Sequence, residues 1–320
     1  MIAATMSTMT GNRLLIHSTF VVLLPLVVAW FGLGFVTTIV LVLLLLLWRW
    51  AIVLSGIFVP EKTPDVVLET IGPSHYAEKV RWCMDRLGVE YTERQSGGTL
   101  GVFFTGRTVP QLRVRTGIVQ TVIGNSPEIL RYLWATNYAL PDNKASFLEP
   151  TSERLDLEQK LDRYGRNLQV WIYYHLLQDR KLTLHAWGID NPRVPAWQRL
   201  TLWVLFPLLA ALIRRSFAIS DEHYGKSVLH IDELLAKIDT LLADGRRSIL
   251  GGDTINYTDI TFAAMSGLWM QPQGYGGGKA DANRITVEQM PAKMRADVER
   301  WFEDHPKVHA YAARLYAEER

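Results

Sequence analysis

Two serines stand where helices are expected to begin, and a hydroxyl group at a helix start can bind an anion. Ser74 follows the turn Gly72-Pro73, and Ser126 precedes Pro127, a residue favoured in the first turn of a helix. The unpaired N–H groups and the dipole of a helix start favour negative charge. Each serine is therefore either an anion ligand or a plain helix cap, and the residues alone leave both readings open.

Composition excludes several kinds of chemistry. The formal net charge of the 320 residues is +2, which gives no basis for binding nucleic acid, and we predict none. The single cysteine, Cys83, excludes an internal disulfide framework and a cysteine-rich zinc site. The eight histidines show no HExxH pairing, so we predict no metal. The glycine-rich run 274–279 lacks the ends of a phosphate-binding loop and is predicted to be a flexible loop.

Residues 61–140 predict a first soluble domain in which strands alternate with helices. A short buried strand precedes Ser74, and the helix after it has one apolar face, formed by Val80, Cys83, Met84 and Leu87. Gly88 is expected to end this helix. The predicted order is strand, helix, strand, irregular stretch, two strands and helix, over residues 66–68, 75–87, 89–94, 111–115, 117–122 and 126–138.

Three pieces of this domain, taken together, resemble the glutathione-binding domain of the glutathione S-transferases. They are LETIGPSHYAEKVRWCMDRLGVEYTE at 68–93, GRTVPQL at 106–112 and GNSPEILRYL at 124–133. With a motif in the second domain, the resemblance covers roughly residues 65 to 320. It implies a thioredoxin-like α/β domain at 61–140, followed by an all-α helical-bundle domain at 145–320.

The resemblance assigns roles to residues in each piece. Ser74 corresponds to the catalytic Ser or Cys and would stabilise the thiolate of glutathione, the expected co-substrate. Pro110 corresponds to a cis-proline, and the backbone of Val109 would pair with the cysteinyl part of glutathione. Asn125 and Ser126 would hold the γ-glutamyl carboxylate. Arg107 would pair with the glycyl carboxylate, an exposed charge being equally compatible.

Two departures from the family pattern bear on function. Asn125 stands where many members carry an acidic or amide residue, and it adds no charge. The start of the first helix carries no cysteine, which argues against thiol exchange and reduction. Cys83 lies on the apolar face of this helix and is predicted to be a core residue.

The second domain is predicted to be helical throughout, with long helical patterns at 152–178 and 227–243. Asn256 and Asp259 resemble the cap residue and aspartate that start the family's central helix, a folding role. An apolar stretch at 200–213 suits a buried helix, with membrane contact as the alternative. A second substrate would lie between the domains, and the candidate pocket residues, each of which could equally be core, are Tyr76, Trp171, Tyr174 and His175.

Residues 1–60 predict a membrane anchor. Residues 14–59 are almost uninterruptedly apolar, and no charged residue occurs between Phe20 and Trp48. As one straight helix this stretch would measure about 69 Å, more than twice the ~30 Å hydrocarbon layer. A transmembrane hairpin over 14–57, turning at Gly32-Leu33-Gly34, accounts for that length. A single transmembrane helix between Trp30 and Trp48 is the alternative, and Arg49 fits it better.

These observations favour a membrane-anchored transferase that conjugates glutathione to a small hydrophobic electrophile. Its partners would be that electrophile and the bilayer, through residues 14–57, and a homodimer is compatible with the resemblance. The soluble domains are expected to face the cytoplasm, where glutathione is abundant. A membrane-tethered adaptor without catalysis is the main alternative. Glutathione-dependent isomerisation and peroxide reduction use the same thiolate and stay open.

Overall fold

The computed structural model describes residues 24–25, 27–32, 34–57, 64–98, 100, 109–116 and 119–320. The chain divides into two compact units. One comprises Met1–Val67 with Arg113–Val122, and the other comprises Leu68–Leu112 with Ile123–Arg320. The second unit contains the whole of the predicted helical domain, 145–320, together with most of the predicted first soluble domain.

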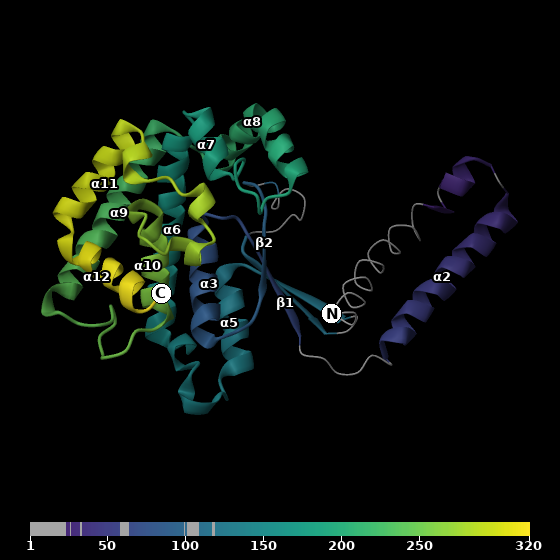
Figure 1. The fold of residues 1–320 in the computed structure, drawn as a ribbon, viewed down its shortest axis with the longest axis horizontal. Helices are drawn as coiled ribbons and strands as arrows, with labels where there is room; N and C mark the ends of the chain where they lie inside the picture. The colour runs from purple at the N-terminus through teal and green to yellow at the C-terminus, as the bar shows by residue number, and fades with distance from the viewer. Residues whose placement is uncertain are drawn as a thin grey trace. The chain divides into compact units, whose positions relative to one another are not determined.

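A four-stranded sheet with the order β2-β1-β3-β4 forms the base of the thioredoxin-like part (Figure 1). The chain forms a strand, a helix and a strand, and then a hairpin of strands followed by a helix. This is the predicted order of elements. The bounds are β1 (Asp65–Thr70), α3 (His75–Leu87), β2 (Thr92–Gln95), β3 (Gln111–Thr116), β4 (Val119–Gly124) and α5 (Ser126–Asn137).

Helix α3 begins and ends where its sequence indicates. The Ser74 side chain caps the first turn by accepting a hydrogen bond from the Ala77 N–H, and Gly88 ends the helix in the left-handed conformation. Its predicted apolar face is buried, and Cys83 is a free, buried thiol whose pKa burial raises to about 12. The prediction that Cys83 is a core residue is therefore confirmed.

An all-helical part follows, as the resemblance implied. Helix α10 (Tyr257–Met270) is buried along its whole length and packs against α3, α6 and α12 (Figure 1). The other helices are α6 (Ser152–Leu176), α7 (Arg180–Ala186), α8 (Ala196–Ser216), α9 (Asp221–Leu241), α11 (Ala292–Asp304) and α12 (Pro306–Glu318). Short 3-10 turns connect them, at Pro141–Asn143, Ser146–Leu148, Leu242–Asp244, Tyr275–Gly278, Asp281–Asn283 and Val287–Gln289.

The predicted pair Asn256 and Asp259 forms a capping box at the start of α10. The Asp259 carboxylate is fully buried and accepts hydrogen bonds from the backbone N–H groups of Asn256 and Ile249. It also accepts one from the Ser248 hydroxyl at 2.8 Å and one from the Tyr311 hydroxyl at 2.7 Å. One side chain thus ties the start of the central helix to the preceding loop and to α12.

Two local predictions are corrected. Helix α5 starts one residue earlier than predicted: Asn125, with φ 73°, is its N-cap instead of Ser126, and Ser126 is already helical. Asparagine tolerates a positive φ better than most residues do. The helix begins here without a side-chain cap hydrogen bond. Second, the glycine-rich segment predicted to be flexible contains a 3-10 turn, Tyr275–Gly278, anchored by the fully buried Tyr275.

Helix α2 (Phe35–Ile57) matches the predicted second helix of the hairpin in its bounds. Residues 27–30 are also helical, and Gly32 and Gly34 between the two segments have φ values of 67° and 92°. Most of the predicted first hairpin helix falls outside the described residues. Among the described helices, α8 is the one that is long and apolar enough to cross a membrane, by length and composition alone. The apolar part of α2, Phe35–Ala51, is shorter.

We predict that Asp259→Ala lowers the free energy of unfolding by more than about 3 kcal/mol, because four donors lose a buried acceptor. Denaturant unfolding of the full chain in detergent measures this loss. Asp253→Ala, at an exposed position on the loop before α10, is the matched control and is expected to stay within about 0.5 kcal/mol of the parent. Equal effects of the two substitutions would contradict the anchoring role.

Candidate functional site

A cavity of about 580 Å³ opens at the N-terminus of α3. Its walls come from the turn before α3, the Val109 loop, the start of α5, one face of α6 and the end of α8. The lining is mostly apolar, and its apolar side chains include Ile71, Tyr173, Leu176, Phe217, Met290 and Met294. A smaller number of polar side chains also line it, which is the usual composition of a small-molecule site.

Ser74, at the start of α3, lines the cavity. Its Oγ accepts the Ala77 N–H at 3.3 Å, so the hydroxyl proton stays available for donation to a second group. The side chain sits at the positive end of the α3 dipole. A group bound here meets an O–H donor and a helix dipole that both favour negative charge.

The predicted cis-proline is present, since the Val109–Pro110 peptide bond is cis. Val109 lines the cavity beside the start of α3, and Asn125 lines it from the start of α5. Ser126, the next residue, is fully buried behind Asn125 and does not itself line the cavity, and its Oγ has no hydrogen-bond partner among the described residues. Buried hydroxyls are normally paired, so this oxygen fits a polar ligand group at the α5 start. Arg107 lies outside the described residues.

Tyr76 and His75, in the first turn of α3, also line the cavity. The Tyr76 hydroxyl approaches the Asp162 carbonyl of α6 at 3.4 Å, and Gly165 of α6 lies beneath it. A Cβ at Gly165 would come within 2.8 Å of the Tyr76 hydroxyl oxygen, so this close approach requires glycine. Burial lowers the pKa of His75 to about 4, which keeps its imidazole neutral.

The pocket residues predicted on α6 are on the wrong faces of that helix. The cavity is lined instead by residues at helical spacing, namely Asp162, Arg166, Gln169, Tyr173 and Leu176. Trp171, Tyr174 and His175 do not line it. Trp171 is fully buried and donates to Asp297, and Tyr174 stacks on Tyr224 and donates to Asp221. His175 is buried against the same residues, 3.5 Å from Asp297.

Sequence reasoning missed the residues that hold the turn before Ser74. The Tyr275 hydroxyl donates to the Pro73 carbonyl at 2.9 Å, one residue before Ser74. Gly72 leaves room for Asn283, whose Oδ1 would lie 2.8 Å from a Cβ there. Asn283 in turn accepts from Asn191 and donates to the carbonyls of His185 and Ala186. These residues come from the predicted loop and the segment after it, where no motif marked them.

A network of buried charges holds α3 against α5 and α6. The ammonium of Lys79, fully buried on α3, donates to Glu158 of α6 at 2.9 Å, and Glu158 also pairs with Arg131 of α5. Burial alone would raise the pKa of Glu158, but Lys79 and Arg131 hold it below its usual range. The ion-pair network therefore joins the helix that carries Ser74 to a helix of each part of the chain.

Comparisons with known proteins return structures only. No family model and no curated protein matches the chain. A glutathione S-transferase from Methylobacterium radiotolerans, in complex with glutathione sulfonate, matches over 79% of this chain and 91% of its own, at 16% identity and a TM-score of 0.49. A theta class glutathione S-transferase from Xanthomonas axonopodis pv. citri, with glutathione bound, matches over 80% and 94%, at 18% identity and a TM-score of 0.41.

A maleylacetoacetate isomerase from Anaeromyxobacter dehalogenans also matches, over 80% of this chain and 88% of its own, at 17% identity and a TM-score of 0.37. The chain's own sheet order and helices define a thioredoxin-like domain followed by an all-helical domain. Among the described residues, no cluster of His, Cys, Asp or Glu is placed to hold a metal ion.

We predict that stability falls with acid because of His75. Its pKa of about 4 lies below the ordinary value of 6.5, so between these values the unfolded chain binds more protons. The stabilising contribution is complete above pH 6.5 and is lost as pH falls through this window. It amounts to roughly 2 kcal/mol between pH 7 and pH 5.

Denaturant unfolding at these two pH values measures the effect. His75→Gln should remove about 2 kcal/mol of the pH dependence, whatever its effect on stability at pH 7. His230→Gln, at an exposed position on α9, should keep the dependence of the parent. The same slope in His75→Gln and the parent would contradict the assignment.

Proposed function

We propose that this protein binds glutathione at the start of α3 and joins it through its sulfur to a hydrophobic electrophile. Ser74 carries the proposal. Its hydroxyl lines the cavity, accepts from the backbone at 3.3 Å and retains a proton to donate. That proton, with the helix dipole, stabilises a thiolate against the thiol and so lowers the pKa of the bound sulfur.

The polar groups around Ser74 suit the rest of a tripeptide. The backbone of Val109 is placed to pair with an extended peptide, and the start of α5, with Asn125 and the unpartnered Ser126 hydroxyl, suits a carboxylate. In the proposed reaction the thiolate forms a C–S bond to an electrophilic carbon. Either a leaving group departs with its electron pair, or an activated double bond takes up a proton from solvent.

The apolar part of the cavity lining suits the second substrate. Tyr173, Phe217, Met290 and Met294 line it, and no acidic side chain other than Asp162 does. An apolar lining of this kind binds by burial rather than by polar recognition. The electrophile is therefore expected to be hydrophobic, with little selectivity among polar groups.

We further propose that residues 14–57 hold the protein in a bilayer with the soluble part facing the cytoplasm. The described part of this segment supports an anchor. Along α2, large apolar side chains are exposed, including Val36, Val40, Leu44 and Leu47. Lipid would shield these apolar side chains from water without a protein partner. Lipid-soluble electrophiles would then be concentrated next to the cavity.

Ser74→Ala tests the chemistry. A hydrogen bond to a charged sulfur contributes roughly 1.5–3 kcal/mol, so kcat/KM for a chlorinated nitroaromatic electrophile should fall about tenfold to a hundredfold. Glutathione binding, measured by calorimetry on the full chain in detergent, should weaken less. Unchanged turnover in the variant would contradict the role of Ser74, and no binding at millimolar glutathione would favour the adaptor.

The control for Ser74→Ala is Ser220→Ala. Ser220 caps α9 in the same way, accepting the His223 N–H at 3.1 Å, and it does not line the cavity. Both substitutions should cost about 1 kcal/mol of stability through the lost cap. Only the substitution at 74 should change turnover. An equal loss of activity in both variants would point to folding rather than to chemistry.

Ser126→Ala tests the carboxylate site. The Oγ of Ser126 is buried without a partner, so its removal should not lower the free energy of unfolding. Glutathione affinity should nevertheless fall about threefold to tenfold, because a hydrogen bond of roughly 0.5–1.5 kcal/mol is lost. Calorimetry and denaturant unfolding measure the two quantities separately.

Ser227→Ala is its matched control. Ser227 is also fully buried with an unpaired Oγ, but it lies on α9 and its sequence neighbours do not line the cavity, whereas Ser126 directly follows the lining residue Asn125. Its replacement should leave glutathione affinity unchanged. An affinity that is the same in Ser126→Ala and the parent would show that this hydroxyl does not touch the ligand.

A further inference from the structure

Helix α8 exposes an apolar face along most of its length. Residues three or four positions apart point outward, and seven large apolar side chains are each between 38% and 64% exposed: Trp197, Leu200, Trp203, Val204, Leu205, Leu208 and Leu212. Water-facing helix surfaces are normally polar, and a contiguous apolar face of this kind marks an interaction site.

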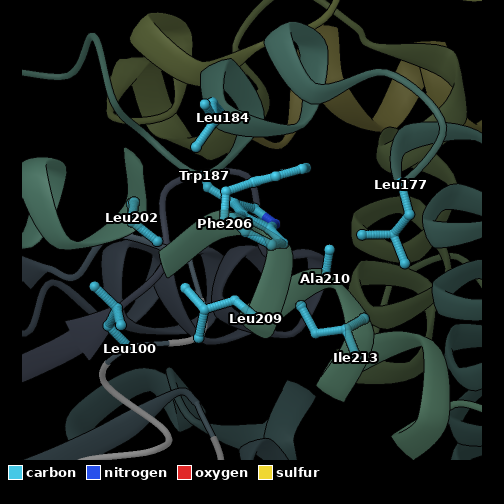
Figure 2. Close-up of a cluster of buried hydrophobic side chains, with 9 residues drawn as sticks. All are labelled: Leu100, Leu177, Leu184, Trp187, Leu202, Phe206, Leu209, Ala210 and Ile213. Atoms are coloured by element: carbon cyan, nitrogen blue, oxygen red, sulfur yellow. The ribbon is translucent and has the colours of Figure 1, made fainter. Parts of the chain in front are cut away.

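The opposite face of α8 is packed into protein. Leu202, Phe206, Leu209, Ala210 and Ile213 are buried in one cluster, whose other members are Leu177 directly after α6, Leu184 of α7, Trp187 and Leu100 (Figure 2). Arg180 of α7 also donates to the Trp203 carbonyl at 2.9 Å. Because one side of α8 is packed against the folded protein, its outer face is the side open to contact with another surface.

The charged residues from 191 to 220 have one sign, and the acidic residues Asp190, Asp221 and Glu222 lie just outside this segment. Residues 191–220 contain four arginines, Arg193, Arg199, Arg214 and Arg215, and no aspartate or glutamate. Arg214 and Arg215 are exposed at the end of α8, and Trp197 and Trp203 are exposed in its first half. Arginines beside apolar side chains and tryptophans complement anionic headgroups above an acyl layer. A second copy docked on this face would bring arginines together without acidic partners from either segment.

We propose that the outer face of α8 rests on an anionic lipid surface, as an interfacial helix. The inference deepens the membrane part of the proposed function, on which it depends for the presence of a bilayer. The apolar side chains would enter the acyl boundary, and the arginines would stay at the headgroups. Because Ile213 and Phe217 also line the cavity, the cavity would lie next to the lipid from which a hydrophobic electrophile arrives.

Site-directed spin labelling of the full chain tests this proposal. Labels at Leu208→Cys on α8, at Leu44→Cys on α2 and at Glu303→Cys on α11 are compared, since the native Cys83 is buried. For each label, collision with oxygen, which partitions into lipid, is measured against collision with a water-soluble nickel chelate. The protein is mixed with vesicles of phosphatidylcholine alone or with phosphatidylglycerol added.

The oxygen-to-nickel ratio at Leu208 is expected to rise several-fold on vesicles with phosphatidylglycerol, and less without it, while Glu303 stays accessible to nickel. A Leu208 label that stays in water, or one shielded from both reagents by another protein surface, would overturn the proposal. An equal rise on both vesicle types would contradict the role of the arginines. The Leu44 label reports the anchor separately, so lipid contact at Leu44 without lipid contact at Leu208 would leave the anchor and refute the role of α8.

Discussion

The placement of one helix, α3, determines the geometry of the whole site. Its first half carries three charged side chains that are fully buried, Glu78, Lys79 and Arg81. Burying a charge is costly unless it is paired, so each of them specifies a partner. Lys79 binds Glu158, Arg81 binds Glu93 with two nitrogens at 2.9 and 2.7 Å, and Glu78 binds Arg320 at 2.8 Å. The helix cannot rotate or slide without leaving a charge unpaired.

These pairs also explain why α3 and β2 belong to the same compact unit as the helical part. Glu158 belongs to α6, Glu93 to β2, and Arg320 is the last residue of the chain. Partners from both parts therefore converge on α3, and Ser74, directly before the first turn of that helix, lines the cavity. On the cavity side the contacts are different in kind. Tyr275 holds the Pro73 carbonyl, and the neutral His75 packs beside Tyr76.

Local signals in the sequence predicted what local physics determines. Ser74 and Gly88 bound α3, and Asn256 with Asp259 start α10, because capping needs only residues a few positions apart. Contacts between residues far apart in the chain could not be predicted from the sequence. No motif near Tyr275 indicates a hydrogen bond to Pro73, 202 residues away, and the glycines around Tyr275 suggested flexibility instead. The face of α6 that lines the cavity was misjudged for the same reason. Trp171 and His175 are aromatic but core, while Arg166 and Gln169 gave no apolar signal.

The central claim is that the start of α3 makes a bound thiol anionic. Glutathione labelled with 13C at the cysteinyl β-carbon reports this directly, because the chemical shift of that carbon follows ionisation of the sulfur. In the presence of saturating full-length protein, the account predicts a titration midpoint at least about one pH unit below the ~8.5 of an ordinary thiol, returning toward that value in Ser74→Ala. A midpoint that stays at the solution value, or one that is lowered equally in Ser74→Ala, would contradict the account.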